Sequence, residues 1–334
     1  MKKIIIIDNS NLGYDGNDIG GKILRGTETS LIFLANEFCK KGYYVDFVNN
    51  IENETNINGV NFLNYSSKKY KQDFYDLAIA VSDANYFDNI KSNKKALFSV
   101  SNQPIEKFLR KKQLLPFIRY KPIVVTLCDY QFKKRNLFTS FFGKKVIPIT
   151  VDPNFFYTND DVNFVPQKKV LYNIRSNRNL DQLIQIWINK IFPKDKKSIF
   201  DITPGLIKNP KKLQEFNIFE RQLTSRKDLI EDLKRYRALL YLGHKSDIFT
   251  LTAEEAIKCC VPVVTYGIGS LSDRVSHNKN GFIVKNENEF AEKTLDLLNN
   301  DQFYLDLKKQ MLKYRSLNSW SNIADQWIQT FLND

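Results

Sequence analysis

Short apolar runs alternate with amphipathic stretches along the first 150 residues. Residues 2–7 form a continuous apolar run that predicts a buried strand, and a polar, glycine-containing loop follows it. Residues 29–41 carry apolar side chains at i, i+3, i+4 and i+7, which predicts a helix that ends at Gly42. Continuous apolar strands separated by helices predict a parallel sheet covered on both faces. Further strands are expected at residues 44–48, 77–81, 96–100, 122–127 and 145–149.

The same alternation begins again after a polar segment at residues 153–167, which we interpret as a linker. Two doubly wound α/β domains with a cleft between them are the simplest architecture that accounts for this pattern. A length of 334 residues also favours two domains. In the second half, strands are expected at residues 169–173, 198–203, 238–241 and 261–266, helices at residues 180–191, 225–236, 252–259 and 290–299, and a last helical region at residues 302–332.

Composition narrows the class of protein. No apolar run approaches the ~18 residues of a membrane span, and the run near the N-terminus is shorter than the ~7–15 residues of a signal-peptide core. The four cysteines form no C-x-x-C pair and only two histidines are present, which argues against a structural zinc site. Reduced thiols are typical of the cytosol, so we expect a cytoplasmic protein.

The chain is basic, with a net charge of +13 from 50 basic and 37 acidic residues. Such a charge favours an anionic partner, although a composition rich in Lys, Asn and Ile accounts for it equally well. Between residues 107 and 145, eleven basic residues stand against one acid, Asp129, and apolar side chains are interleaved with them. That pattern suits an anionic membrane surface, a nucleic acid, or two core helices with solvated basic faces.

The most informative stretch is residues 246–281. It resembles the donor-site signature of retaining glycosyltransferases of family 4, in which a second acid follows a first acid by eight residues. Asp247 stands at the first acid, Phe249 follows it, and Glu255 is the second acid, with Pro262 closing the motif before two valines. The family usually has Glu at the first position. Two of its glycines are replaced here, by Thr250 and Cys260.

The resemblance implies a role for each acid. Asp247 would contact the donor sugar, and Glu255 would accept hydrogen bonds from the two ribose hydroxyls, which is a strong bidentate arrangement for a carboxylate. The turn that contains Gly269, Ser270 and Leu271 follows a strand and should open a helix, where backbone amides can bind a phosphate or sugar oxygen. In the family this turn contacts the donor sugar and its phosphate.

A second match lies at residues 170–181, where the family has a strand, a loop ending in a basic residue, a Gly, and then Leu-Asp. Arg178 takes the place of the cation that grips the donor diphosphate, Asn179 replaces the Gly, and Arg175 is a nearby second cation. Guanidinium groups suit phosphate oxygens because their N–H donors form a fork. Alternatively, Arg175 and Arg178 are each a solvated loop arginine without a ligand.

The N-terminal half carries weaker matches. Gly20, Gly21 and Gly26 lie between the first strand and the first helix and resemble the family's glycine-rich loop, which faces the donor phosphates. Glycine lets backbone approach a ligand closely. Many members have a His after a first-domain strand, near the reacting sugar. Here Asn102 stands at the comparable place, and we expect it to act as a hydrogen-bond donor.

The resemblance implies the GT-B fold, with two doubly wound, Rossmann-like α/β domains facing each other across a cleft. Residues 1–160 would form the acceptor side and residues 161–315 the donor side. Residues 316–334 would form a helix that crosses back to the first domain.

The implied reaction moves a sugar from a nucleotide diphosphate sugar to an acceptor hydroxyl with retention, and Asp247, Arg178 and Asn102 would carry it. No D-x-D triplet occurs, so we expect no metal, and no cofactor beyond the nucleotide sugar. The expected acceptor is a glycan or lipid-linked molecule, reached from the inner face of a membrane through residues 107–145. A non-catalytic binding module and a protein that acts on nucleic acid are the alternatives.

Overall fold

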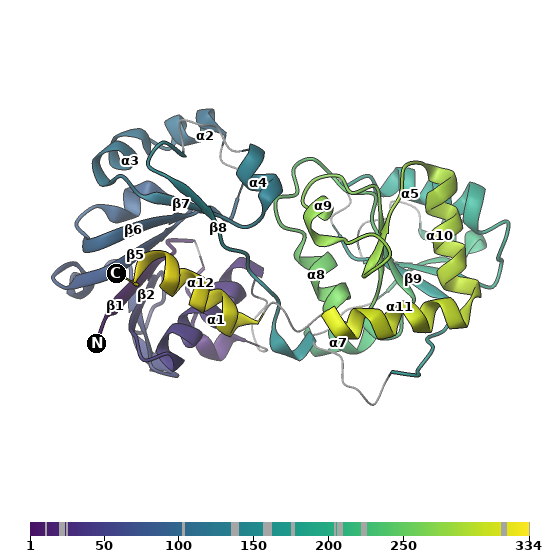
Figure 1. Cartoon of the computed structure of the whole chain (residues 1–334), viewed down its shortest axis with the longest axis horizontal. Helices are drawn as coiled ribbons and strands as arrows, with labels where there is room; N and C mark the ends of the chain where they lie inside the picture. The colour runs from purple at the N-terminus through teal and green to yellow at the C-terminus, as the bar shows by residue number, and fades with distance from the viewer. Residues whose placement is uncertain are drawn as a thin grey trace. The chain divides into compact units, whose positions relative to one another are not determined.

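The chain folds into two compact units (Figure 1). Unit 1 comprises residues 1–152 and 318–334, and unit 2 comprises residues 153–317. Within the part of the chain that is described, no helix is long and apolar enough to cross a membrane. The computed structural model describes residues 1–10, 12–19, 24, 26–101, 104–134, 140–155, 162–174, 178–203, 205, 210–221, 226–314 and 319–333.

Unit 1 is built on a sheet of eight strands in the order β3-β4-β2-β1-β5-β6-β7-β8. The pairs are parallel except for β3 with β4, which is a hairpin at the edge. The expected apolar core is confirmed at β1, because Ile4–Ile7 are completely buried. The strands are β1 (Lys3–Ile7), β2 (Tyr44–Asn49), β3 (Thr55–Ile57), β4 (Val60–Asn64), β5 (Phe74–Val81), β6 (Lys91–Phe98), β7 (Ile123–Thr126) and β8 (Lys144–Val146).

The last helix of the chain packs on unit 1, beside the first helix (Figure 1). Trp320 donates its indole N–H to the carbonyl oxygen of Val151 at 3.0 Å, and Trp327 is buried against Phe98. The chain therefore passes between the two units twice, at residues 152–153 and 317–318. The helices of unit 1 are α1 (Gly26–Lys40), α2 (Ile105–Arg110), α3 (Leu114–Tyr120), α4 (Asp129–Lys134) and α12 (Trp320–Phe331).

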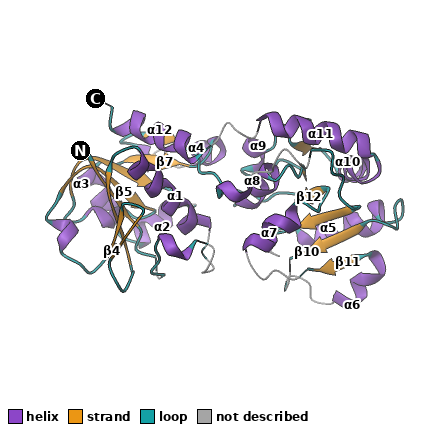
Figure 2. Ribbon diagram, turned by 90° about the horizontal axis from the view of Figure 1, so that it is seen from below, coloured by secondary structure: helices purple, strands orange, loops and turns teal. Residues whose placement is uncertain are grey.

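Unit 2 has a six-stranded parallel sheet in the order β11-β10-β9-β12-β13-β14, with helices packed around it (Figure 2). The sequence predicted two parallel α/β sheets, and this prediction is confirmed. The strands are β9 (Lys169–Tyr172), β10 (Ile199–Ile202), β11 (Ile218–Glu220), β12 (Ala238–Leu240), β13 (Val263–Thr265) and β14 (Gly281–Ile283). The helices are α5 (Leu180–Ile186), continued by a π-helical turn (Trp187–Ile191), α6 (Pro210–Leu213), α7 (Arg226–Leu233), α8 (Leu251–Lys258), α9 (Leu271–Arg274), α10 (Glu287–Asn299) and α11 (Asp301–Tyr314).

The order of the strands in unit 2 reverses between β9 and β12. From β9 the chain adds β10 and β11 on one side, then returns to add β12, β13 and β14 on the other. In open parallel sheets, ligands bind outside the carboxyl ends of the strands at such a reversal. The loops that follow β9 and β12 are therefore the first place to look for a site.

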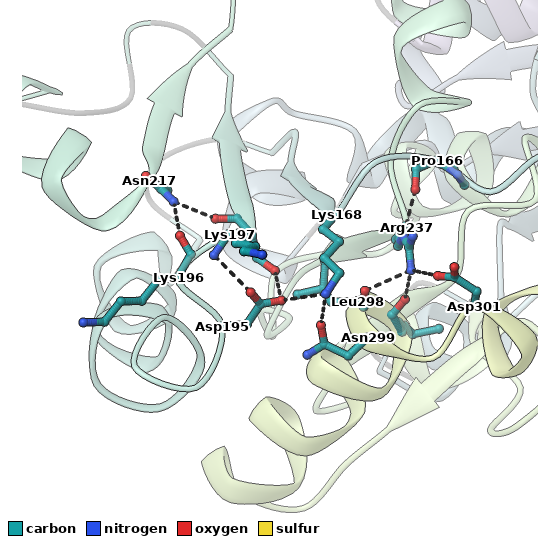
Figure 3. Close-up of polar contacts among 12 residues, drawn as sticks. Pro166, Lys168, Asp195, Lys196, Lys197, Asn217, Arg237, Leu298, Asn299 and Asp301 are labelled. Atoms are coloured by element: carbon teal, nitrogen blue, oxygen red, sulfur yellow. Dashed lines mark hydrogen bonds and ion pairs between the residues drawn. The ribbon is translucent and has the colours of Figure 1, made fainter.

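The amino ends of the same strands are closed by a structural network (Figure 3). Arg237 is buried, and its guanidinium donates to the carbonyl oxygens of Pro166 and Leu298 at 2.9 Å and pairs with Asp301 at 2.7 Å. Lys168 pairs with Asp195 at 3.4 Å. These contacts satisfy the last carbonyls of α10 and fix the chain where it enters unit 2. The amino ends of these strands therefore serve stability.

Candidate functional site

Two loops meet at the reversal of strand order in unit 2, one after β9 and one after β12. Arg178 from the first loop places its Nε 3.0 Å from Oδ1 of Asp247 in the second. Both side chains are mostly buried but reach solvent, with 18% of the Arg178 side chain and 13% of the Asp247 side chain exposed. Because both groups are partly desolvated, this ion pair attracts more strongly than the same two charges would in bulk water.

A buried tyrosine holds the other oxygen of the carboxylate. The hydroxyl of Tyr241 donates to Oδ2 of Asp247, and its ring packs edge-on against Tyr172 with 6.1 Å between the ring centroids. Burial, and after it the hydrogen bond to Asp247 and the charge of that carboxylate, raises the pKa of Tyr241 well above its usual value. The phenol therefore remains protonated at neutral pH and acts as a donor that fixes the carboxylate.

The two loops are also joined by polar contacts around His244 and Asn179. Nδ1 of His244 lies 3.3 Å from Nη1 of Arg178 and 3.1 Å from the backbone nitrogen of Ser246. The side-chain amide of Asn179 donates to the carbonyl oxygen of Gly243 at 2.8 Å. The contact with His244 restrains the Arg178 side chain, and the Asn179 hydrogen bond joins its loop to the loop after β12.

The turn after β13, which contains Gly269 and Ser270, packs against the loop that carries Asp247. The backbone N–H of Ser270 donates to the carbonyl oxygen of Asp247 at 3.0 Å, and Gly269 adopts a positive φ of 75° in close contact with the same loop. Ser270 and Leu271 are completely buried, and the Ser270 hydroxyl bonds that of Thr250 at 3.0 Å. The turn therefore supports the Asp247 loop, with the Ser270 amide engaged inside the protein.

The two neighbouring acids of α8 have different surroundings. Glu254 is buried and pairs with Lys258 at 3.7 Å and with Arg274 at 3.6 Å, and the Arg274 guanidinium stacks on the ring of Phe249. Glu255, the residue that the motif spacing selects, is also buried. Because Glu254 belongs to an ion-pair network that joins α8 to α9, the structure gives it a stabilising role.

The other expected site residues belong to unit 1 or lie outside the described residues. Gly26 is the first residue of α1 in unit 1, where its carbonyl oxygen accepts a hydrogen bond from Ser30. Gly20, Gly21, Asn102 and Arg175 lie outside the described residues. Among the described residues, no group of three or more His, Cys, Asp or Glu side chains could hold a metal ion.

Comparison with known proteins shows a family match within unit 2. Residues 213–314, which include Asp247, Glu255 and Gly269, match the family described as glycosyl transferases group 1. Over this part of unit 2 the chain is similar to the group 1 glycosyltransferases. An uncharacterized glycosyltransferase of Methanocaldococcus jannaschii is 25% identical over 206 residues, which is 58% of this chain and 55% of that protein. A probable sucrose-phosphate synthase of Thermosipho melanesiensis is 26% identical over 202 residues, covering 55% and 46%.

Several solved structures share the fold of this chain. Sucrose-phosphate synthase from Thermosynechococcus elongatus has a TM-score of 0.68 at 14% identity, covering 99% of this chain and 98% of that one. WaaG, a glycosyltransferase involved in lipopolysaccharide biosynthesis, has a TM-score of 0.65 at 10% identity, covering 99% and 100%. Anabaena HepE, solved in complex with UDP and glucose, has a TM-score of 0.67 at 14% identity, covering 99% of both. These likenesses establish the GT-B fold, while the chain spans about half the length of the curated relatives it matches.

The structure shows which of the glycine positions of the family pattern still have a glycine-like backbone in this chain. Asn179 has a φ of 63° and Cys260 a φ of 57°, so both of these positions have the left-handed conformation that favours glycine. Asn tolerates it better than most side chains, whereas Cys carries the full steric cost. Thr250, in contrast, has a φ of −88°, which any residue adopts.

Sequence reasoning missed two side chains that the fold of unit 2 brings to the site. Tyr172 and Tyr241 end apolar runs that predict buried strands, so each reads as a core residue in the sequence. Their position directly at the carboxyl ends of neighbouring strands β9 and β12 was the available signal. His244 was visible as a loop residue, but its contact with Arg178 depends on the tertiary fold.

Proposed function

We propose that this chain transfers a sugar from a nucleoside diphosphate sugar to an acceptor hydroxyl, with retention of the anomeric configuration. The observation that carries the proposal is the Arg178–Asp247 pair at the reversal of strand order in unit 2. A cation and a carboxylate held in a partly desolvated place can bind the two halves of one donor. The match of residues 213–314 to the group 1 glycosyltransferases and the UDP complex of the structural neighbour HepE support this proposal.

Each residue then has a separate part in the proposed reaction. Arg178 stabilises the charge that develops on the leaving diphosphate, which is preorganised electrostatic catalysis. Asp247, fixed by Tyr241, accepts hydrogen bonds from the donor sugar, and Glu255 accepts them from the ribose hydroxyls. The acceptor attacks on the face from which the diphosphate departs, and a diphosphate oxygen takes the acceptor proton. Arg178 supplies the positive charge, so the reaction proceeds without a metal ion.

The proposed function is tested first by ligand-induced stabilisation. Thermal unfolding is measured with UDP, GDP, ADP, CMP and dTDP and the corresponding nucleotide sugars, in the presence of EDTA. A ligand at ~100 times its dissociation constant adds about 2.7 kcal/mol to the free energy of unfolding. A shift with one nucleotide supports the proposal and names the base. No shift with any nucleotide, in EDTA or with Mg²⁺ or Mn²⁺, contradicts it.

Turnover distinguishes the enzyme from a non-catalytic binding module. We expect the wild type to release the nucleoside diphosphate from its donor, and Asp247→Ala and Glu255→Ala to abolish that release. Binding of the donor without any turnover by the wild type would instead favour the binding module.

Exposed residues of unit 1 support the proposal that the acceptor is presented at a membrane. Its apolar members are Leu109 on α2, Leu115 and Ile118 on α3, and Phe141 before β8, with exposed fractions of 48%, 78%, 47% and 78%. Three phenylalanines of the segment, Phe108, Phe117 and Phe142, pack into or against the core, so part of the interleaved pattern serves the core. Exposed cations lie in the same segment, namely Arg110, Lys111, Lys112, Arg119 and Lys121.

Cations with exposed apolar side chains between them match an anionic bilayer, where the cations meet the headgroups and the apolar groups lie below. We therefore include an anionic membrane surface and a lipid-linked or cell-surface glycan acceptor in the proposed function, with the protein acting from the cytoplasmic face. Interleaved cations and aromatic residues also suit nucleic acid, which remains the less favoured partner.

Vesicle sedimentation tests this surface. We expect binding to vesicles that contain phosphatidylglycerol, and little binding to pure phosphatidylcholine or in high salt. The double variant Leu115→Ser, Phe141→Ser should lose the binding. Phe74→Ser is the matched control, because Phe74 is 55% exposed in the same unit but begins β5, away from the basic segment. Equal binding by both variants, or tighter binding to DNA than to vesicles, would contradict the membrane assignment.

A further inference from the structure

His244 contacts Arg178 through one particular nitrogen. The ring lies in the loop after β12, three residues before Asp247, and its Nδ1 is approached by two donors. The backbone N–H of Ser246 lies at 3.1 Å and Nη1 of Arg178 at 3.3 Å. An imidazole nitrogen has a single lone pair, so two donors that share it are expected at distances slightly above the usual 2.9–3.0 Å.

These two contacts define the state of the ring. A backbone N–H and a guanidinium N–H can only donate, so Nδ1 must accept from both. The histidine is therefore neutral, with its proton on Nε2. A protonated ring would carry hydrogen on Nδ1 and would lose both contacts, with two cations side by side. The structure thus assigns the tautomer of His244 from the hydrogen bonds around it.

The consequence concerns the guanidinium of Arg178. Asp247 contacts Nε and His244 contacts Nη1, so the planar group is held at two of its three nitrogens. Among the described residues, none bonds to Nη2. A fork that is fixed in this way loses little side-chain entropy when its remaining donors bind an anion.

We propose that His244 is a positioning residue that orients the Arg178 guanidinium for the diphosphate of the donor. The inference rests on the proposed function and extends it to a residue outside the two-acid motif. His244 acts through Arg178, and its neutral Nδ1 is the atom that matters. It follows that removal of this acceptor should weaken binding of the diphosphate while leaving binding of the nucleoside part unchanged.

Two variants separate the acceptor from the bulk of the ring. His244→Phe keeps a ring of similar size and removes the acceptor. His244→Asn places an amide oxygen close to the position of Nδ1, where it can accept from the Ser246 N–H two residues on, as in an Asx turn. The matched control is His277→Phe, because Nδ1 of His277 also accepts a backbone N–H, from Ile283 at 3.2 Å, with no link to Arg178.

Affinities are measured by calorimetry for UDP and uridine, or for the pair with the base that the thermal panel selects. We expect His244→Phe to weaken UDP binding about tenfold, as loss of a hydrogen bond to a charged group would. Uridine binding should be unchanged, His244→Asn should restore UDP binding to within about threefold, and His277→Phe should bind like the wild type. In steady state, the donor KM should rise more than kcat falls.

A double-mutant cycle provides the decisive test. If His244 acts through Arg178, His244→Phe should have no further effect on UDP affinity in an Arg178→Ala background. An equal effect in both backgrounds would overturn the inference, as would unchanged UDP affinity in His244→Phe alone. Failure of the wild type to bind any nucleoside diphosphate would overturn the proposed function and this inference with it, so the two failures are distinguishable.

Discussion

Gly269 lies so close to His244 that a Cβ atom on the glycine would be 2.3 Å from the carbonyl oxygen of His244. The same Cβ would be 3.1 Å from the carbonyl oxygen of Asp247. Both obstacles are backbone atoms of the loop that carries the candidate acid, so that loop would have to shift. The absence of a side chain at residue 269 is therefore a condition for the position of Asp247.

This relationship predicts different effects for alanine at two neighbouring glycines. Gly267 also has a positive φ, but its Cβ would meet Cγ2 of Ile283 at 2.9 Å, a side-chain atom that can move. We expect Gly267→Ala to cost about 1 kcal/mol in the free energy of unfolding, from backbone strain. Gly269→Ala should cost more and should also weaken donor binding. Urea denaturation and UDP titration measure the two effects, and equal UDP affinity in both variants would contradict the prediction.

The second prediction concerns the charge of Asp247. In Asp247→Asn, an amide oxygen can still accept from Arg178 or Tyr241, so the fold and thermal stability should change little. The negative charge is lost, and we expect kcat to fall by about 10² or more, as for other preorganised electrostatic contacts. Donor turnover and thermal unfolding are measured together.

Tyr241→Phe provides the graded comparison for Asp247→Asn. It keeps the carboxylate and the packing of the ring, and it removes only the hydroxyl donor. Its loss of activity should be smaller. A Tyr241→Phe enzyme less active than Asp247→Asn would show that the carboxylate charge is not the main contribution.

The central strands were predictable from the sequence, whereas the hairpin at one edge of the first sheet and both edge strands of the second were not. Continuous apolar runs such as Ile4–Ile7 are buried on both faces of a sheet and have no other simple explanation. The sequence analysis missed β3 and β4, because β3 has three residues and asparagines interrupt the apolar side chains of β4, although Val60 and Phe62 are completely buried. The signal that could have found this hairpin was the pair Asn58-Gly59, where both residues have positive φ. It likewise missed β11 and β14, which have three residues each.

The candidate site shows a similar division. Spacing within one segment selected Asp247 and Glu255, and it separated Glu255 from its neighbour Glu254. The contacts of Asp247 with Arg178 and Tyr241 depend on which strands lie side by side, and a pattern along the chain carries no such information. The roles of these residues in catalysis remain predictions.

The third prediction concerns Cys260, a buried residue with a φ of 57°. Cys260→Gly and Cys260→Ala both remove the thiol, and they differ only in the Cβ that the left-handed conformation disfavours. The glycine variant should be more stable than the alanine variant by about 0.5–1 kcal/mol, because relief of steric strain outweighs the greater entropy of its unfolded chain. Chemical denaturation measures the difference. An alanine variant as stable as the glycine variant would show that this turn relaxes without strain.

The fourth prediction separates the two neighbouring acids of α8. Glu254→Gln leaves the buried side chains of Lys258 and Arg274 without their carboxylate partner, and breaking a buried ion pair in this way costs about 3–5 kcal/mol. Glu255→Gln removes the carboxylate proposed to bind the ribose hydroxyls, and it should weaken UDP binding without a comparable loss of stability.

Urea denaturation and UDP titration on both variants, at a temperature where each is folded, provide the test. We expect Glu254→Gln to have reduced stability with near-normal UDP affinity, and Glu255→Gln to have the reverse. The opposite assignment would mean that Glu254, despite its ion pairs, is the acid that contacts the donor. The register of the two-acid motif, in which the second acid follows Asp247 by eight residues, would then be wrong for this chain.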